Sequence, residues 1–224
     1  DWVIYRASSY QLSENSQYAE AAKIESGRRD NEDRAQREAA VSDGFTAALY
    51  PQAYDDLGIN QPSPLIAGIP DTDTYFCNEG YGLIRYRSDR FGFRNNDNIW
   101  EQKISRLMIG DSFVHGACVH DDATLASNIE KETGLNTLNL GSIGNAPMDY
   151  MAILKSLVKP ILNDSNKKNK VIMFFYGNDN IRFNMKKKYS FNKMKPIVKI
   201  ENDKGIYPTK EYALKIKEIY ENNF

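Results

Sequence analysis

The sequence predicts an α/β fold in which helices cover both faces of a parallel sheet. Three short apolar runs alternate with helix-like segments between residues 104 and 180. Each run is continuously apolar, as in strands that are buried on both faces. The links between strands and helices are short, which favours a doubly wound arrangement. The length of 224 residues fits one domain with an appendage.

The composition excludes several classes of protein. A hydrophobic share of 41% and a charged share of 26% are close to globular averages, so the chain is not disordered throughout. The net charge of −1 lacks the long-range field of a general nucleic-acid binder. No run approaches the roughly 18 consecutive apolar residues of a membrane span. We therefore expect neither a nucleic-acid partner nor a membrane span in this chain.

Residues 1–103 are predicted to form a helical and irregular extension, and residues 104–224 the α/β domain. Residues 12–49 are polar, rich in alanine and free of proline, which favours helix, with a break at Gly27. Residues 51–70 carry Pro, Gly and Asp turn signals. Residues 81–94 suggest a short strand followed by a turn.

The elements of the α/β domain follow in order. Strands are predicted at 107–109, 137–140 and 171–176, because each is a short apolar run that ends at a glycine. Helices are predicted at 124–133 and 148–162, the second with apolar positions that include Met151 and Leu157. A hairpin strand at 197–200, a turn near 203–205 and a helix over 210–220 complete the chain.

A small or polar cluster follows each of the three strands directly. The clusters are Gly110-Asp111-Ser112, Gly141 to Asn145, and Gly177-Asn178-Asp179. Ligands of open parallel sheets bind at the carboxyl ends of the strands. We therefore expect the three clusters to converge on one place, although they are far apart in the sequence.

The content of these clusters fits acyl transfer. Ser112 is predicted to lie at a helix N-terminus, where free N–H groups favour developing negative charge. Gly144 would offer an unobstructed backbone N–H, and Asn178 a side-chain amide. A hydroxyl nucleophile with converging donors is an oxyanion-hole arrangement. The alternative is that Gly-Asp-Ser is only a helix cap and that the other clusters are ordinary turns.

The three blocks, Ile109 to Phe113, Asn139 to Gly144 and Tyr176 to Asp179, resemble three of the four sequence blocks of the SGNH (GDSL-type) hydrolase superfamily. The segment Ser88 to Arg94 resembles one found upstream of the first block in bacterial members. The resemblance implies a flavodoxin-like three-layer sandwich. It implies Ser112 as the nucleophile, with Gly144 and Asn178 completing the oxyanion hole. Residues near the substrate would be Asp111, His115, Asn145 and Asp179.

The sequence departs from the family in one block. The final block, Asp-x-x-His, is absent, and the only histidines are His115 and His120. Three predicted strands also stand where the family has about five. We therefore expect the sequence to be truncated at its C-terminal end. His115 could instead act as the base, three positions after Ser112, but a role as a pocket-lining residue is favoured.

The two cysteines, Cys77 and Cys118, form either one disulfide or two buried thiols. A disulfide would favour an extracytoplasmic compartment, and the opening at Asp1 hints at an anchor or signal upstream. No metal or organic cofactor is expected, because the cysteines and histidines lack ligand spacing.

The sequence therefore favours a serine esterase acting on small O-acyl esters, with acylated carbohydrates as a substrate class by family analogy. Two alternatives stay open. One is an O-acetyltransferase for a cell-surface polysaccharide, and the other is an inert binding module with the same fold. The oligomeric state is not predicted.

Overall fold

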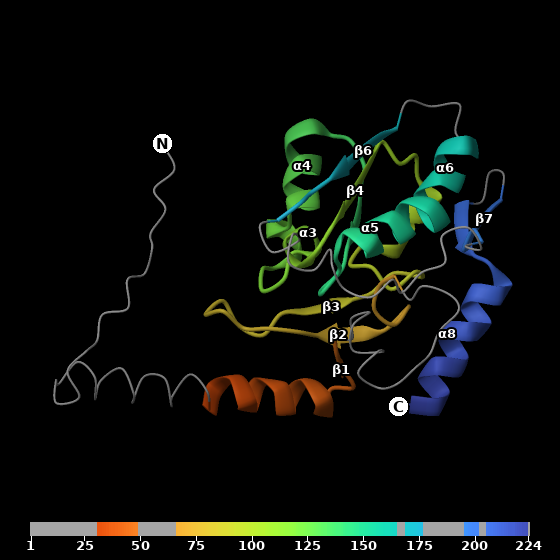
Figure 1. The fold of residues 1–224 in the computed structure, drawn as a ribbon. Coiled ribbons are helices and arrows are strands. Elements are labelled where there is room, and N and C mark those ends of the chain that lie inside the picture. Colours follow the sequence, from red (N-terminus) through yellow and green to blue (C-terminus); the bar gives the residue numbers. More distant parts are fainter. Residues whose placement is uncertain (1–30, 49–65, 165–168, 177–194, 202–204, 224) are drawn as a thin grey trace.

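The computed structural model describes residues 31–48, 66–164, 169–176, 195–201 and 205–223 (Figure 1). Its centre is a parallel sheet of three strands in the order β5–β4–β6. The strands are β4 (Arg106–Gly110), β5 (Thr137–Gly141) and β6 (Lys170–Met173). The α/β class with a parallel sheet is confirmed.

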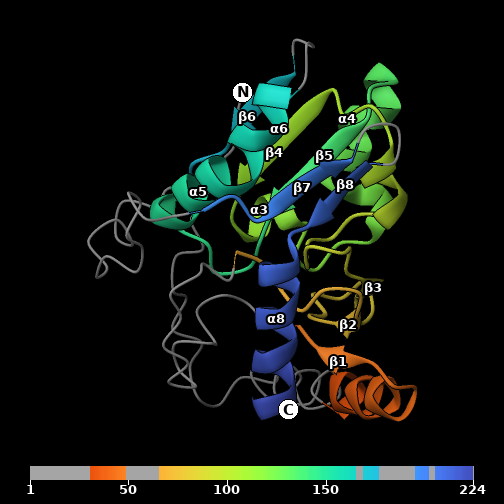
Figure 2. The same cartoon turned by 90° about the vertical axis from the view of Figure 1, so that its right-hand side faces the viewer.

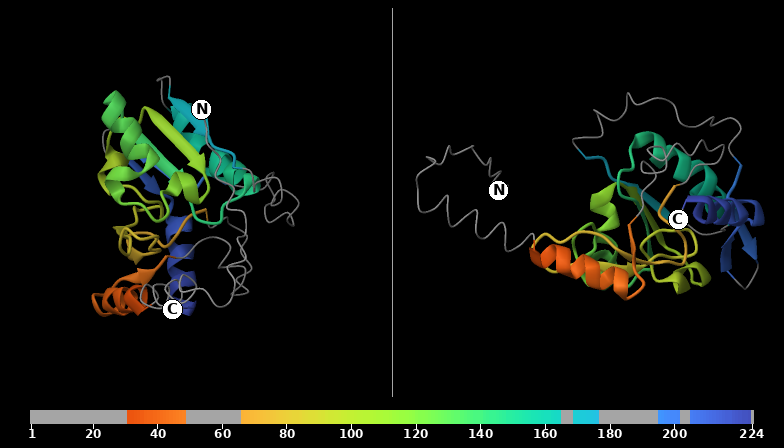
Figure 3. Two further views of the ribbon diagram at one scale, coloured as in Figure 1. Left: turned by 90° about the vertical axis from the view of Figure 1, so that its left-hand side faces the viewer. Right: turned by 90° about the horizontal axis from the view of Figure 1, so that it is seen from below.

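Alternate residues of β4 point to opposite faces of the sheet, and each face is covered by helices. Met108 packs with Val114 and Ala126 on the side of the first helices. Leu107 and Ile109 belong to the larger core on the other side. The first face carries α3 (Ser112–His115) and α4 (Leu125–Thr133); the second carries α5 (Pro147–Ile153) and α6 (Lys159–Asp164) (Figures 1 and 3).

The helix predicted over 148–162 is present as α5, a π-helical turn η3 (Leu154–Val158) and α6. Pro160 has no N–H to donate to the carbonyl of Ser156, which explains why the regular ladder is interrupted there. The freed Ser156 carbonyl accepts from the N–H of Ile197, at 3.0 Å. One predicted core position is wrong: Met151 is 47% exposed, while its neighbour Ala152 is buried.

The third strand is shorter than predicted. The run 171–176 contributes β6 only as far as Met173, and the N–H of Phe174 adds one bond to the carbonyl of Ile109, at 2.9 Å. Phe175 and Tyr176 are exposed beyond the strand. The predicted hairpin pairing and last helix are confirmed as antiparallel β7 (Val198–Glu201) and β8 (Gly205–Pro208) and as α8 (Lys210–Asn223) (Figure 2). Residues 203 and 204 of the predicted turn lie outside the described residues.

The described part of the N-terminal extension contains an α-helix over residues 31–42, the 3-10 helix η1 (Asp97–Glu101) and a small sheet. The sheet has the order β1–β2–β3, from β1 (Thr46–Ala47), β2 (Asp73–Tyr75) and β3 (Arg85–Arg87). The helix ends earlier than the predicted residue 49, because Gly44 takes a left-handed conformation, φ +86°, and turns the chain into β1. The predicted break at Gly27 lies outside the described residues.

The extension and the α/β unit share one core. Phe91, Phe93 and Trp100 are at most 1% exposed and belong to the same cluster as Leu138 of β5 and Tyr150 of α5. The domain boundary at residue 103 stays a prediction. The shared cluster nevertheless shows that the extension fixes the position of the parallel sheet.

Candidate active site

Ser112 is the first residue of α3, directly after the carboxyl end of β4. The Asp111 carboxylate caps this helix by accepting from the N–H of Phe113, at 3.0 Å. In the described part of the chain, neither the hydroxyl nor the backbone N–H of Ser112 is hydrogen-bonded. The helix has only four residues, so its dipole is weak. Any stabilisation of negative charge here depends on individual N–H groups.

The loop that carries Gly144 leaves the sheet beside Ser112. Gly110 and Gly141 are register partners at the ends of β4 and β5, and the N–H of Ser142 donates to the carbonyl of Gly110, at 3.2 Å. Gly144 has a left-handed backbone, φ +76°. Its N–H makes no hydrogen bond to another described residue. Two of the three predicted clusters therefore emerge side by side.

Gly141 is required by the close approach of α3. A Cβ at this position would lie 2.2 Å from the backbone nitrogen of His115. Only glycine lets the two elements meet so closely. The glycine at the end of β5 thus brings the Ser112 helix and the Gly144 loop together.

The third predicted cluster, with Asn178 and Asp179, lies outside the described residues. The chain that leads to it does reach the site. The ring of Tyr176 lies 4.2 Å from that of Phe113, centroid to centroid, and Phe113 follows Ser112. The contribution of Asn178 to an oxyanion hole stays a prediction.

Asn145 and Asp111, both predicted near the substrate, are buried. The Asn145 amide nitrogen is 3.5 Å from the carbonyl oxygen of Ile66, and its Oδ1 has no partner among the described residues. Asp111 has the capping bond to Phe113. Both side chains hold their loops in place, and contact with substrate stays a prediction for each.

Asn139, in the middle of β5, ties the two loops together. Its Oδ1 accepts from the N–H of Gly141, at 2.9 Å, and its Nδ2 lies 3.5 Å from the carbonyl oxygen of His115. Its own backbone N–H and carbonyl are paired with the Asn95 side chain, each at 2.9 Å. This role of Asn139 was not predicted from the sequence. The signal was an asparagine inside an otherwise apolar strand.

The Ser88 to Arg94 segment braces this arrangement from the extension. Asp89 is fully buried, and its carboxylate accepts four hydrogen bonds of 2.8–2.9 Å. The donors are the N–H groups of Phe91 and Phe93, the Asn95 amide and the Trp100 indole. Burial raises the pKa of Asp89 to about 7 and outweighs these donors. The segment supports the site without belonging to it.

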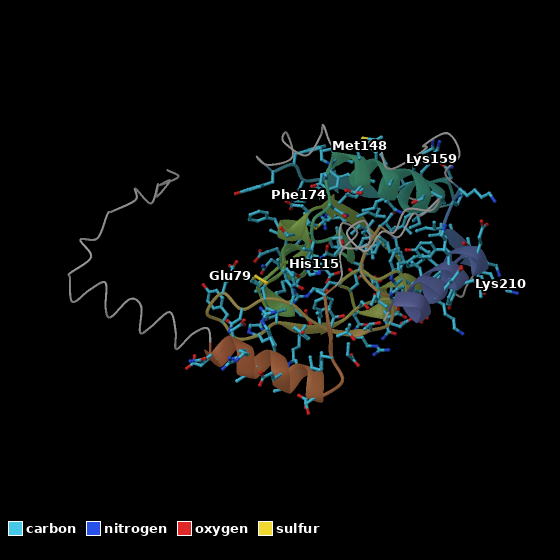
Figure 4. All side chains as sticks on the ribbon, turned by 60° about the horizontal axis from the view of Figure 1, so that its bottom comes forward. Glu79, His115, Met148, Lys159, Phe174 and Lys210 are labelled. Carbon is cyan, nitrogen blue, oxygen red and sulfur yellow. A yellow bond between two sulfur atoms is a disulfide. The ribbon has the colours of Figure 1, made fainter. Side chains whose placement is uncertain are left out.

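His115, the last residue of α3, is buried in the interior, where its ring contacts the extension (Figure 4). Its Nε2 is 3.2 Å from the Tyr86 hydroxyl, and its ring meets Tyr86 and Phe76 edge-on. Its Nδ1 is buried without a partner among the described residues. Burial, and secondarily the Arg94 charge, lower the pKa of His115 to about 3, so the imidazole is neutral at pH 7. The residue is 4% exposed, and its predicted contact with substrate stays a prediction.

Two further links fix the loop after α3 to the extension. Cys77 and Cys118 form a disulfide, which the sequence had left as one of two alternatives. The buried Arg94 guanidinium pairs with Asp121, at 2.7 Å, and donates to the carbonyl of Gly116, also at 2.7 Å. The local sequence around Arg94 does not indicate this role, because both partners lie more than 20 positions away. The start and the end of the Ser112 helix are therefore both anchored.

No helix in the described ranges is long and apolar enough to cross a membrane. Those ranges also hold no group of three or more His, Cys, Asp or Glu side chains suited to a metal ion. Comparisons with protein families, with curated proteins and with solved structures find no match for this chain.

Proposed function

We propose that this protein is an SGNH-type serine esterase that acts on small O-acyl esters, with acylated carbohydrates as its substrate class. The observation that carries the proposal is the position of Ser112. A serine with an unbonded hydroxyl follows one parallel strand, beside a glycine loop that follows the neighbouring strand. This edge of a parallel sheet is where ligands bind.

The chemistry would proceed through an acyl-enzyme. The Ser112 hydroxyl would attack the ester carbonyl while the N–H groups of Ser112 and Gly144 bind the oxyanion. The Asn178 amide would add a third donor. Collapse of the tetrahedral intermediate would break the ester C–O bond and expel the alcohol, which takes up the serine proton through the general base. Water would then attack the acyl-enzyme, release the carboxylic acid and restore the serine.

The strand order supports the finer fold assignment in this proposal. In chain order the three strands are arranged as second, first, third, which is how a flavodoxin-like sheet begins. The disulfide supports an extracytoplasmic location, because such bonds persist in oxidising compartments.

The general base is not positioned by the described residues. His115 is bonded to Tyr86, and His120 is exposed with its Nε2 3.1 Å from the Tyr81 carbonyl oxygen. These are the only histidines of the sequence. The proposed mechanism therefore requires a general base other than the residues that the structure describes.

A fluorophosphonate probe tests the proposal, because it labels only serines that are already activated. We expect a covalent adduct by intact mass, lost in Ser112→Ala and kept in Ser127→Ala, a matched serine on α4. Hydrolysis of p-nitrophenyl acetate should follow the same pattern. A folded protein without an adduct would contradict the esterase and favour the inert binding module. Label that persists in Ser112→Ala would place the nucleophile elsewhere.

A further inference from the structure

A groove of about 700 Å³ runs between residues 86–102 of the extension and helix α4. It reaches the amino end of β5 at Asn136 and Thr137, whereas Ser112 follows the carboxyl end of β4 and is not part of its lining. The volume is within the range of small-molecule sites. The groove is thus separate from the candidate active site.

Uncharged polar side chains dominate this groove. Nine of its seventeen lining residues are Asn, Gln, Ser or Thr, and five of the nine carry amides. Asn98 and Gln102 are exposed at the surface. The Asn98 side chain has no hydrogen bond to another described residue, so both its donor and its acceptor are available to a ligand.

Four of the five charged side chains in the groove are already in ion pairs within the protein, and the fifth, Glu130, accepts a hydrogen bond from the backbone N–H of Thr137. Arg94 is paired with Asp121, and Arg87 with Asp73, at 3.1 Å. Asp97 is paired with Arg90, so no lining arginine or aspartate lacks a counter-charge. A phosphate or carboxylate ligand would have to compete with these carboxylates for the guanidinium groups. The groove therefore favours an uncharged ligand.

The edge of β5 that borders the groove is closed to an added peptide strand. The N–H of Thr137 donates to the Glu130 carboxylate, at 2.7 Å. The N–H and carbonyl of Asn139 are bonded to the Asn95 side chain. Because β-strand addition requires free backbone groups on the edge, these bonds disfavour a peptide.

We propose that the groove binds an uncharged, polyhydroxylated chain, that is, a neutral glycan. The Asn98 amide offers a donor and an acceptor together, and Gln102, whose oxygen accepts from Asn136, keeps its amide N–H groups, which matches neighbouring hydroxyl groups. Ile99, which is partly exposed, provides a small apolar surface for the C–H face of a sugar ring. This inference goes beyond the proposed esterase and does not depend on it, because the groove would bind without any catalytic step.

The test uses the full chain with Ser112→Ala, so that catalysis plays no part. The probes are neutral hexasaccharides of glucose, mannose and N-acetylglucosamine, with hexagalacturonate as the anionic comparison and an extended hexapeptide as the peptide comparison. Side-chain amide resonances in ¹⁵N-edited NMR spectra report the binding. We expect at least one neutral chain to shift the amides of Asn98, Gln102 and Asn136.

Adding Asn98→Arg fills the groove and should weaken that binding about tenfold or more. Asn163→Arg is the matched control, exposed on α6, and should leave binding unchanged. The proposal is overturned if no neutral chain shifts these amides at about 10 mM, ample for a millimolar Kd. It is also overturned if the anion or the peptide binds more tightly, or if Asn98→Arg binds as well as the control. If the protein that retains Ser112 forms no fluorophosphonate adduct, this contradicts the proposed esterase activity and leaves the glycan proposal unaffected.

Discussion

Asp89 shows how a single carboxyl group is linked to pH through folding. It is fully buried, four donors bind it, and burial raises its pKa to about 7 from an ordinary value of 3.8. The folded protein therefore holds this proton more tightly than the unfolded chain does. The stability contributed by the proton is complete below about pH 4 and is lost as the pH rises to about 7.

Asp89→Asn should remove this dependence. Asn also places a donor against groups that already donate, so the variant is less stable at every pH. The difference in the free energy of unfolding between wild type and variant should be largest near pH 4 and should shrink toward pH 7. Urea titrations across this range measure it. The stabilities of wild type and variant must be subtracted at each pH. The pKa of His115 is lowered to about 3, so its titration makes the protein more stable as the pH rises from 3 to 6.5, which is opposite to the effect of Asp89.

Asp122→Asn is the control, because it makes the same Asp-to-Asn change at a residue that is exposed to solvent. It should leave the slope of stability against pH as in wild type. A constant difference between wild type and Asp89→Asn from pH 4 to 8 would contradict the assignment of the proton to Asp89.

At the scale of the elements, the sequence predicted strands and helices well where local patterning decides them. The strands β4 and β5 and the helix α4 follow from continuous apolar runs and from turn residues. Ser112 and Gly144 were found because their loops follow those strands. Asn95, Asn139 and Tyr86 were not, because their roles depend on contacts between segments about 30–45 positions apart. Local periodicity carries no information about such contacts.

The disulfide is also a contact between segments far apart in the sequence, and in this case the link is covalent. It joins Cys77, which follows β2, to Cys118, which follows α3, and closes a loop with a sequence separation of 41 residues. Cross-linking a loop of this length lowers the entropy of the unfolded chain, an effect worth about 4 kcal/mol by the chain-entropy relation. Cys77→Ser with Cys118→Ser should lower the free energy of unfolding by up to about this amount.

Urea unfolding with and without a reductant measures this effect. Reduced wild type should unfold like the double variant, and reductant should not affect the double variant itself. The same midpoint for oxidised wild type and the variant would mean that the link contributes nothing. If the bond also holds the Ser112 helix in place, labelling by fluorophosphonate should be slower after reduction at a urea concentration where the protein is still folded.

At the scale of the whole molecule, the extension and the α/β unit depend on each other. The central sheet has only three described strands, and Phe91, Phe93 and Trp100 of the extension complete its core. Asn95 closes the outer edge of β5, and Arg94 holds the loop after α3. Without the extension, the edge of β5 and the loop after α3 would be exposed to water.

A chain that starts at Ile104 should therefore fail to fold, whereas one that starts at Ile66 should keep the core. Removing three buried aromatic side chains forfeits roughly 5–9 kcal/mol of burial, comparable with the 5–15 kcal/mol of net stability typical of a domain. Dispersion of amide resonances in ¹⁵N-edited NMR spectra distinguishes the two outcomes. In the full chain with Trp2→Phe, which leaves Trp100 as the one tryptophan, fluorescence and far-UV circular dichroism should change at the same urea concentration, because one core serves both parts. A well-dispersed spectrum from the shorter chain would instead establish an independent domain from residue 104. The extension would then be an accessory and not a structural part of the site.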